Sequence, residues 1–180
     1  MADAAEAVAG VPNGTVRLKW PNDLVVEGSG GMRKLGGVLG ETDGLGSADP
    51  RVVVGIGVNA DWPAGDFPPE LASSMTSLRE ISGERRTPPS ELLDAFLPRL
   101  ETGIESLRGG SFDDAGWTDR QLTTGRMIRL VDHDGHDEIV RAVRCDPVSG
   151  ALIVADPGSP GGERAVVSGE VRHVRLSGDV

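Results

Sequence analysis

The sequence predicts a mixed α/β fold that is rich in short strands. Its 180 residues include 26 glycines and 12 prolines but only 3% aromatic residues, a composition typical of many turns between short strands. Apolar residues recur at helical spacing over residues 92–107, whereas residues 125–180 hold a series of short β-prone runs. We therefore expect an α/β domain over residues 1–124, followed by a small β-barrel over residues 125–180.

The first sixty residues or so predict a helix followed by strands. Alanine-rich residues 2–9 favour a helix, which Gly10 and Pro12 end. Strands are expected after it, at residues 15–19, 24–26, 34–41 and 51–58. The last of these is a near-continuous apolar run, so we expect a central strand that is buried on both faces.

The rest of the first domain is expected to hold a proline-rich loop and two helices. Residues 62–69 contain too many prolines for a regular element. A long helix is predicted with Thr87 as its N-cap and Pro88 in its first turn, and we expect Pro98 to kink it. Its apolar residues fall on one face, which we expect to pack on a sheet. A shorter helix is expected within residues 112–122.

The second domain is predicted to be all β. Its strands are expected at residues 127–131, 139–144, 151–155, 165–167 and 171–176. Asp134-Gly135 and Ser149-Gly150 are hairpin signals between them. Strands this close together bury a core only by curling into a small barrel.

Composition and charge exclude several classes of partner. The formal net charge is −10 and the basic residues are scattered, so we expect no nucleic acid partner. A single cysteine, Cys145, excludes an intramolecular disulfide and suits a reducing compartment. Residues 1–10 lack the pattern of a signal peptide, and no apolar run reaches about 18 residues. We therefore expect a cytoplasmic protein without membrane contact.

Three motifs lie close together in the first domain: LKWPNDL at residues 18–24, RKLGGVLGE at 33–41 and GIGVN at 55–59. In this order and spacing they resemble the catalytic-domain motifs of the biotin protein ligase family, and KWPND followed by KLGG carries most of the specificity. The resemblance implies a class II synthetase-like biotin/lipoate ligase core, with a mixed sheet and packed helices, and a C-terminal SH3-like barrel. The implied reaction uses ATP and Mg²⁺ to convert biotin to biotinyl-5′-AMP, then transfers biotin to a lysine of a biotin carboxyl carrier protein domain.

Lys34, in the KLGG string, is the expected catalytic residue. A carboxylate that attacks the α-phosphate of ATP meets another anion, so the site needs fixed positive charge and metal to hold the two together. The resemblance implies that this lysine contacts both the biotin carboxyl group and the phosphate. An arbitrary lysine is usually a solvated surface residue, but the surrounding motif favours the catalytic role.

Polar residues near the motifs are expected to bind the nucleotide. Asn22 and Asp23 follow a proline that fixes the local backbone, and a carboxylate at Asp23 suits Mg²⁺ held on the phosphates. Ordinary turn chemistry is the alternative interpretation of this Pro-Asn-Asp sequence. Asn59 ends a strand, from which its side chain can reach ribose or phosphate. Trp20 is expected to pack against the ligand or against the core, and the sequence leaves both open.

Four glycines are expected to line the biotin and adenylate pocket: Gly36, Gly37, Gly55 and Gly57. Without side chains they let a flat ligand approach the backbone closely. For Gly57 alone, a bulge or tight packing is an equally good interpretation. A dinucleotide-binding fingerprint is excluded, because the third glycine and the following helix are missing.

Other chemically active side chains are interpreted as structural. Five metal-ligating residues lie near one another, at Asp132, His133, Asp134, His136 and Asp137. They span a predicted hairpin turn whose side chains diverge, so a solvated turn is favoured over a metal site. His173 lies on an alternating strand, and Cys145 has no base nearby in the sequence, so we expect neither to react.

One family motif is missing from the sequence, a glycine- and arginine-rich loop of GRGRxG type that wraps biotin and the adenylate. We therefore expect a shortened form of a full enzyme rather than a natural fragment, with little catalysis by this chain alone. Two alternatives stay open: a non-catalytic interaction module on the same fold, and a lipoate ligase-like transferase, against which the KWPND and KLGG strings argue. A homodimer is also left open.

Overall fold

The computed structural model describes residues 1–180 except positions 29, 45, 48, 50, 132–134 and 174–180. The chain divides into two compact units, of which the first comprises Met1–Arg17 and Asn22–Phe112, and the second comprises Leu18–Pro21 and Asp113–Val180. The expected domain boundary at residue 124 lies inside the second unit. The KWPND motif is split, because its first residues belong to the second unit and its last two to the first.

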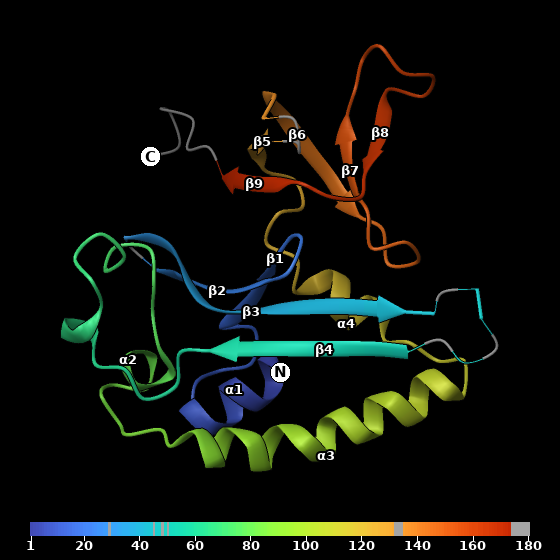
Figure 1. Ribbon diagram of the computed structural model, residues 1–180. Coiled ribbons are helices and arrows are strands. Elements are labelled where there is room, and N and C mark those ends of the chain that lie inside the picture. Colours follow the sequence, from blue (N-terminus) through green and yellow to red (C-terminus); the bar gives the residue numbers. More distant parts are fainter. Residues whose placement is uncertain (29, 45, 48, 50, 132–134, 174–180) are drawn as a thin grey trace. The chain divides into compact units, whose positions relative to one another are not determined.

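A four-stranded sheet with the order β1-β2-β3-β4 organises the first unit (Figure 1). Its strands are β1 (Val16–Lys19), β2 (Asp23–Gly28), β3 (Gly31–Asp43) and β4 (Arg51–Val58). The pairs β2–β3 and β3–β4 are antiparallel. The predicted mixed α/β class is confirmed, and each strand expected in this region is present.

Helices accompany the sheet on one side (Figure 1). They are α1 (Ala2–Ala9), α2 (Leu78–Ile81) and α3 (Pro89–Arg108), and a 3-10 helix, η1 (Ala64–Asp66), lies in the proline-rich loop. The expected Thr87 cap of α3 is wrong by one residue: Pro88 is the N-cap, and the Thr87 hydroxyl donates instead to the Arg85 carbonyl oxygen at 3.3 Å. The helix continues through Pro98. Among the described residues, no helix has the length and apolarity needed to cross a membrane.

β4 is an exposed edge strand, which corrects the prediction of a central strand buried on both faces. Within the described part of the chain it pairs only with β3. Val52, Val53 and Val54 are 65%, 64% and 55% exposed. A run of apolar residues reports a preference for burial, but it does not supply the neighbouring strand that would bury it.

The apolar face of α3 is also open. Leu92 is the buried residue of this helix, whereas five other apolar residues are exposed: Leu93, Leu97, Leu100, Ile104 and Leu107. A hollow of about 420 Å³ runs along the helix beside Leu97, Leu100 and Ile104. α3 contacts α1. The expectation that its whole apolar face packs on a sheet is therefore wrong for the described residues.

We expect Val53→Lys to reduce self-association of the chain. An unpaired edge strand with consecutive exposed valines offers backbone donors and acceptors and apolar area to a second chain, and a charged side chain on such an edge opposes pairing. Sedimentation velocity over a concentration series should show association of the parent chain and a shift toward monomer in the variant. A parent chain that stays monomeric at all concentrations would contradict the expectation.

The second unit is a five-stranded antiparallel sheet with the order β8-β7-β6-β5-β9. Its strands are β5 (Met127–Val131), β6 (Asp137–Cys145), β7 (Leu152–Ala155), β8 (Glu163–Val166) and β9 (Glu170–His173), and a short helix, α4 (Asp114–Asp119), precedes them. Ile128, Leu152 and Val171 are fully buried in its core. The predicted strands are present, although residues 174–176 of the last one lie outside the described residues. Closure of the sheet into an SH3-like barrel stays a prediction.

Candidate functional site

Lys34 and Asp23 form an ion pair between neighbouring strands of the first unit. Asp23 is the first residue of β2, and Lys34 lies near the start of β3. The Lys34 Nζ atom is 2.5 Å from Asp23 Oδ1, and the two side chains are 42% and 14% exposed. The lysine is therefore accessible while its partner carboxylate is largely covered. The structure brings together two of the residues to which the motifs point.

A β-bulge sets the direction of the Lys34 side chain. Between two successive residues of β2, the partner on β3 changes from Gly36 to Lys34, so Leu35 is an extra residue, and it is fully buried. In a regular strand Lys34 and Gly37 would point to opposite faces, because side chains alternate. The extra residue reverses the alternation. Lys34 accordingly shares a face with Gly37, where an added Cβ would lie 3.5 Å from the Lys34 Nζ atom.

Three of the four motif glycines lie on the same face as Lys34. Gly37 pairs with Gly57, and Gly55 pairs with Leu39 two residues further along β3. Residues directly opposite one another in an antiparallel pair share a face. A Cβ added to Gly57 would meet nothing within 4 Å, and one added to Gly55 would meet only the Leu39 carbonyl oxygen at 3.9 Å. Within the described part of the chain this face is thus open at Gly57 and Gly55, with the exposed side chain of Leu39 beside them.

Gly36 is a glycine for a different reason. It pairs with Val58 of β4, and an added Cβ would overlap the Gly57 carbonyl oxygen and lie 3.2 Å from Val58 Cα. Both are backbone atoms, which cannot rotate away as a flexible side chain would. The close approach of β3 and β4 accounts for this glycine, and lining of a ligand pocket stays a prediction for it.

The two asparagines assigned to the nucleotide use their side-chain amides to hold the backbone. Asn22 Nδ2 donates to the Val38 carbonyl oxygen at 2.8 Å, and the Val38 N–H donates to the Asn22 carbonyl oxygen at 2.9 Å. Asn59 Nδ2 donates to the Thr76 carbonyl oxygen at 2.9 Å. Both residues flank the strand that carries Lys34. A contact between either of them and ribose or phosphate stays a prediction.

Trp20 packs in the core of the second unit, which is the second of the two roles left open for it. It is only 3% exposed and lies among the core residues Ile128 and Leu152. Its indole Nε1 donates to the Gly150 carbonyl oxygen at 2.9 Å. A side chain this buried and already hydrogen-bonded has little surface left for a ligand, and a contact between Trp20 and a ligand stays a prediction.

The remaining candidates do not form a metal centre in the described residues. No group of three or more His, Cys, Asp and Glu side chains is placed to hold an ion there. Residues 132–134 of the Asp/His cluster, for which a solvated turn is expected, lie outside the described residues, and Asp137 pairs with Arg129. Burial raises the pKa of the Cys145 thiol to about 11, so the protonated, weakly nucleophilic form prevails at neutral pH. His173 ends β9.

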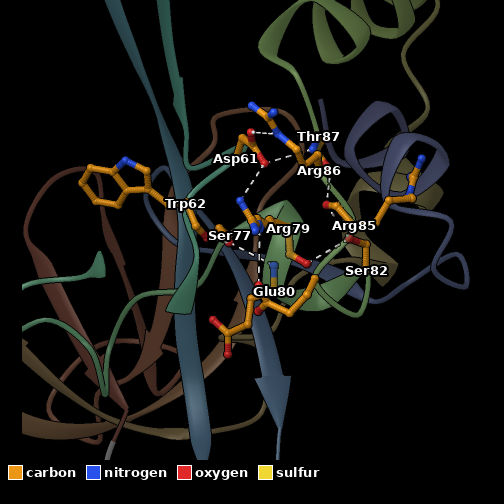
Figure 2. Close-up of polar contacts among 10 residues, drawn as sticks. Asp61, Trp62, Ser77, Arg79, Glu80, Ser82, Arg85, Arg86 and Thr87 are labelled. Atoms are coloured by element: carbon orange, nitrogen blue, oxygen red, sulfur yellow. Dashed lines mark hydrogen bonds and ion pairs between the residues drawn. The ribbon is translucent and has the colours of Figure 1, made fainter. Parts of the chain in front are cut away.

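Asp61 holds together the segment that follows β4 (Figure 2). Its Oδ1 accepts from the Thr87 N–H at 3.2 Å and lies 3.6 Å from the Arg79 guanidinium, and its Oδ2 accepts from Arg86 Nε at 3.2 Å. Burial raises the pKa of Asp61, but the bond from Thr87 and the two guanidinium groups outweigh it and lower the pKa below its ordinary value. The carboxylate therefore stays ionised, and its contribution to stability is lost only as the pH falls through that lowered pKa.

Residues 74–80 form part of the Lys34 surroundings, and motif reasoning missed them. The Lys34 N–H donates to the Ser74 carbonyl oxygen at 2.7 Å, and the Thr76 N–H donates to the Lys34 carbonyl oxygen at 2.9 Å. The sequence does carry one signal for this segment. Ser77 and Glu80 have the spacing of a capping box, and the Ser77 hydroxyl accepts from the Glu80 N–H at 3.1 Å.

Comparisons with known proteins agree on one family. The model of the Biotin/lipoate A/B protein ligase family matches residues 1–59. The chain is 31% identical over 175 residues to the biotin–acetyl-CoA-carboxylase ligase of Mycobacterium tuberculosis, and the aligned region covers 96% of this chain and 59% of that ligase. It is 38% identical over 80 residues to the bifunctional ligase/repressor BirA of Bacillus spizizenii, and the aligned region covers 44% of this chain and 22% of BirA.

The fold is similar as well. A biotin protein ligase from Aquifex aeolicus, solved in complex with biotin and ATP, matches with a TM-score of 0.72 at 25% identity, over 97% of this chain and 67% of that chain. The chain spans 59% of the length of its M. tuberculosis relative. With the family model, the M. tuberculosis relative and the fold in agreement, the chain belongs to the biotin protein ligase family.

Proposed function

We propose that this chain carries part of the active site of a biotin–carrier-protein ligase, including the lysine that binds the reacting phosphate. The observation that supports this most is the position of Lys34 Nζ, 2.5 Å from Asp23 on a face of the sheet that glycines leave open. In the proposed reaction a biotin carboxylate oxygen attacks the α-phosphorus of ATP and pyrophosphate leaves. The ε-amine of a carrier lysine then attacks the acyl carbon and AMP leaves.

Lys34 would act mainly in the first step. Two anions must approach each other, and an accessible ammonium fixed on a strand offsets their repulsion and the charge that grows in the transition state. The bulge aims the ammonium at the open face, and Asp23 limits the positions that the flexible side chain can occupy. The ammonium is thereby oriented before the substrate arrives, which lowers the entropy lost on binding.

The open face suits a flat ligand. Gly37, Gly55 and Gly57 remove side chains from a strip that begins next to Lys34. The Asp23 carboxylate lies beside this strip and, together with phosphate oxygens, fits the ligand set that Mg²⁺ prefers. Bound Mg²⁺ would neutralise charge on the phosphates. We propose the strip as the surface for biotin and adenylate.

Binding of two adenylate analogues distinguishes biotin from lipoate, because the matching family includes ligases for both. We expect a non-hydrolysable biotinyl-5′-AMP analogue to bind this chain at least about 10-fold more tightly than its lipoyl counterpart, a difference of about 1.4 kcal/mol. Isothermal titration calorimetry measures both without requiring turnover. Tighter binding of the lipoyl analogue would favour a lipoate transferase, and binding of neither would favour the non-catalytic module.

A further inference from the structure

We propose that Glu80 is a positioning residue for Lys34, an inference that builds on the proposed role of this lysine. Its carboxylate bonds to two side chains close to Lys34, those of Arg33 and Thr76. One oxygen, Oε1, pairs with Arg33, the residue directly before the lysine. The other, Oε2, accepts from the Thr76 hydroxyl at 3.0 Å. Thr76 follows Met75, the bridge partner of Lys34, and its N–H donates to the Lys34 carbonyl oxygen, so Glu80 links the strand to the adjacent segment.

The bonds of Glu80 lie where one edge of β3 changes its neighbouring segment. The pairing of β3 with β4 begins at Gly36 and Val58, beyond the lysine. At Lys34 the same edge of β3 is covered instead by residues 74–76, through the bonds to Ser74 and from Thr76. This short parallel bridge has few hydrogen bonds of its own. The side-chain link through Glu80 therefore adds to the two backbone bonds that hold the segment against the strand at Lys34.

Glu80 is itself held in a fixed position. It lies in the first turn of α2, where its N–H donates to the Ser77 hydroxyl at 3.1 Å. The Ser77 hydroxyl in turn donates to the Trp62 carbonyl oxygen at 2.5 Å (Figure 2). Thr76 and Ser77 are fully buried, and the Glu80 side chain is only 20% exposed. Bonds to a carboxylate shielded from water are stronger and more directional than those on an open surface.

The consequence for the site follows from the bulge. Leu35 makes Lys34 point to the open face only while the residues on either side of the bulge keep their pairing. If Glu80 is neutralised, the bond to Arg33 weakens and the 74–76 segment loosens. The backbone of Lys34 then samples more conformations, and its ammonium spends less time aligned with Asp23 and the glycine strip.

The test replaces Glu80 by its neutral near-isostere, Glu80→Gln, with Glu84→Gln as a matched control. Glu84 also pairs with an arginine of this region, Arg79, at 3.3 Å, but its side chain is 54% exposed and this partner lies in α2 rather than in β3. We expect amide hydrogen exchange at Lys34 and Thr76 to accelerate at least about 10-fold in Glu80→Gln and to stay unchanged in the control. Affinity for the biotinyl-5′-AMP analogue should fall several-fold in Glu80→Gln only.

The following outcomes decide the proposal. Exchange at Lys34 and Thr76 that stays as in the parent chain shows that Glu80 does not hold this segment. Equal acceleration at all amides shows a general loss of stability instead. Thr76→Val, which removes a single bond with little change in volume, must then accelerate exchange locally at Lys34 and Thr76, or the proposal fails. Local acceleration with unchanged affinity for the analogue shows that the bonds of Glu80 do not position Lys34 for binding. Lack of analogue binding by the parent chain argues against the proposed function, while the exchange comparison still tests whether Glu80 holds residues 74–76 against β3.

Discussion

Gly36→Ala should destabilise the first unit by roughly 1–3 kcal/mol, whereas Gly57→Ala, on the paired strand, should leave its stability nearly unchanged. An added methyl at Gly36 overlaps the Gly57 carbonyl oxygen and presses on Val58 Cα, so β3 and β4 must separate at the site. The methyl at Gly57 points to the open face and meets nothing within 4 Å. Urea denaturation followed by circular dichroism measures the free energy of unfolding of both variants.

The effect on ligand affinity should be the reverse of the effect on stability, with Gly57→Ala as the variant that binds more weakly. Gly57→Ala places a methyl on the strip proposed for the adenylate, so the biotinyl-5′-AMP analogue should bind this stable variant less tightly. Equal stability of Gly36→Ala and Gly57→Ala would show that the strands at Gly36 adjust to a side chain, and that our structural explanation of this glycine is wrong.

Lys34→Ala should weaken binding of the biotinyl-5′-AMP analogue by about 10- to 100-fold, that is about 1.4–2.7 kcal/mol. The variant would lose the charge-assisted contact between the ammonium and the phosphate. Stability should change by less than about 1 kcal/mol, because a lysine whose side chain is 42% exposed gains little from its ion pair with Asp23. Calorimetric titration at two salt concentrations measures the affinity and its electrostatic part.

Arg51→Ala serves as the charge-matched control. Arg51 begins β4 at the end of the strand remote from Gly57, and its side chain is 75% exposed. We expect analogue affinity close to that of the parent chain. If Arg51→Ala weakens binding as much as Lys34→Ala does, the effect comes from overall charge rather than from a specific site at Lys34.

Local patterns predicted most of the elements because each element is fixed by nearby residues. The helix over residues 2–9 ends at Gly10 in the left-handed conformation, as expected of a glycine that follows a helix. The strands of both units lie close to their predicted positions. The burial of β4 and α3 was predicted wrongly, because apolar character shows which residues favour burial but not which partners the chain provides.

The motifs pointed to Lys34 and Asp23, but the geometry around these two residues was not predictable from the sequence. No residue pattern marks Leu35 as the extra residue of a bulge, although that residue decides which face Lys34 uses. Gly36 and Gly37 are adjacent and look equivalent, yet one is required by a backbone contact and the other faces the open strip. The contact between Glu80 and the strand joins residues 47 positions apart, and only the fold brings them together.

A residue-resolved titration tests the central claim, that the face carrying Lys34 binds the adenylate, most directly. The biotinyl-5′-AMP analogue would be added to isotopically labelled chain and the amide signals followed by NMR. We predict the largest shifts at Lys34, Gly37, Gly55 and Gly57, with their loss in Lys34→Ala. Saturating analogue that shifts none of these signals, or only those of the hollow beside Leu97 and Ile104 on α3, would contradict the account.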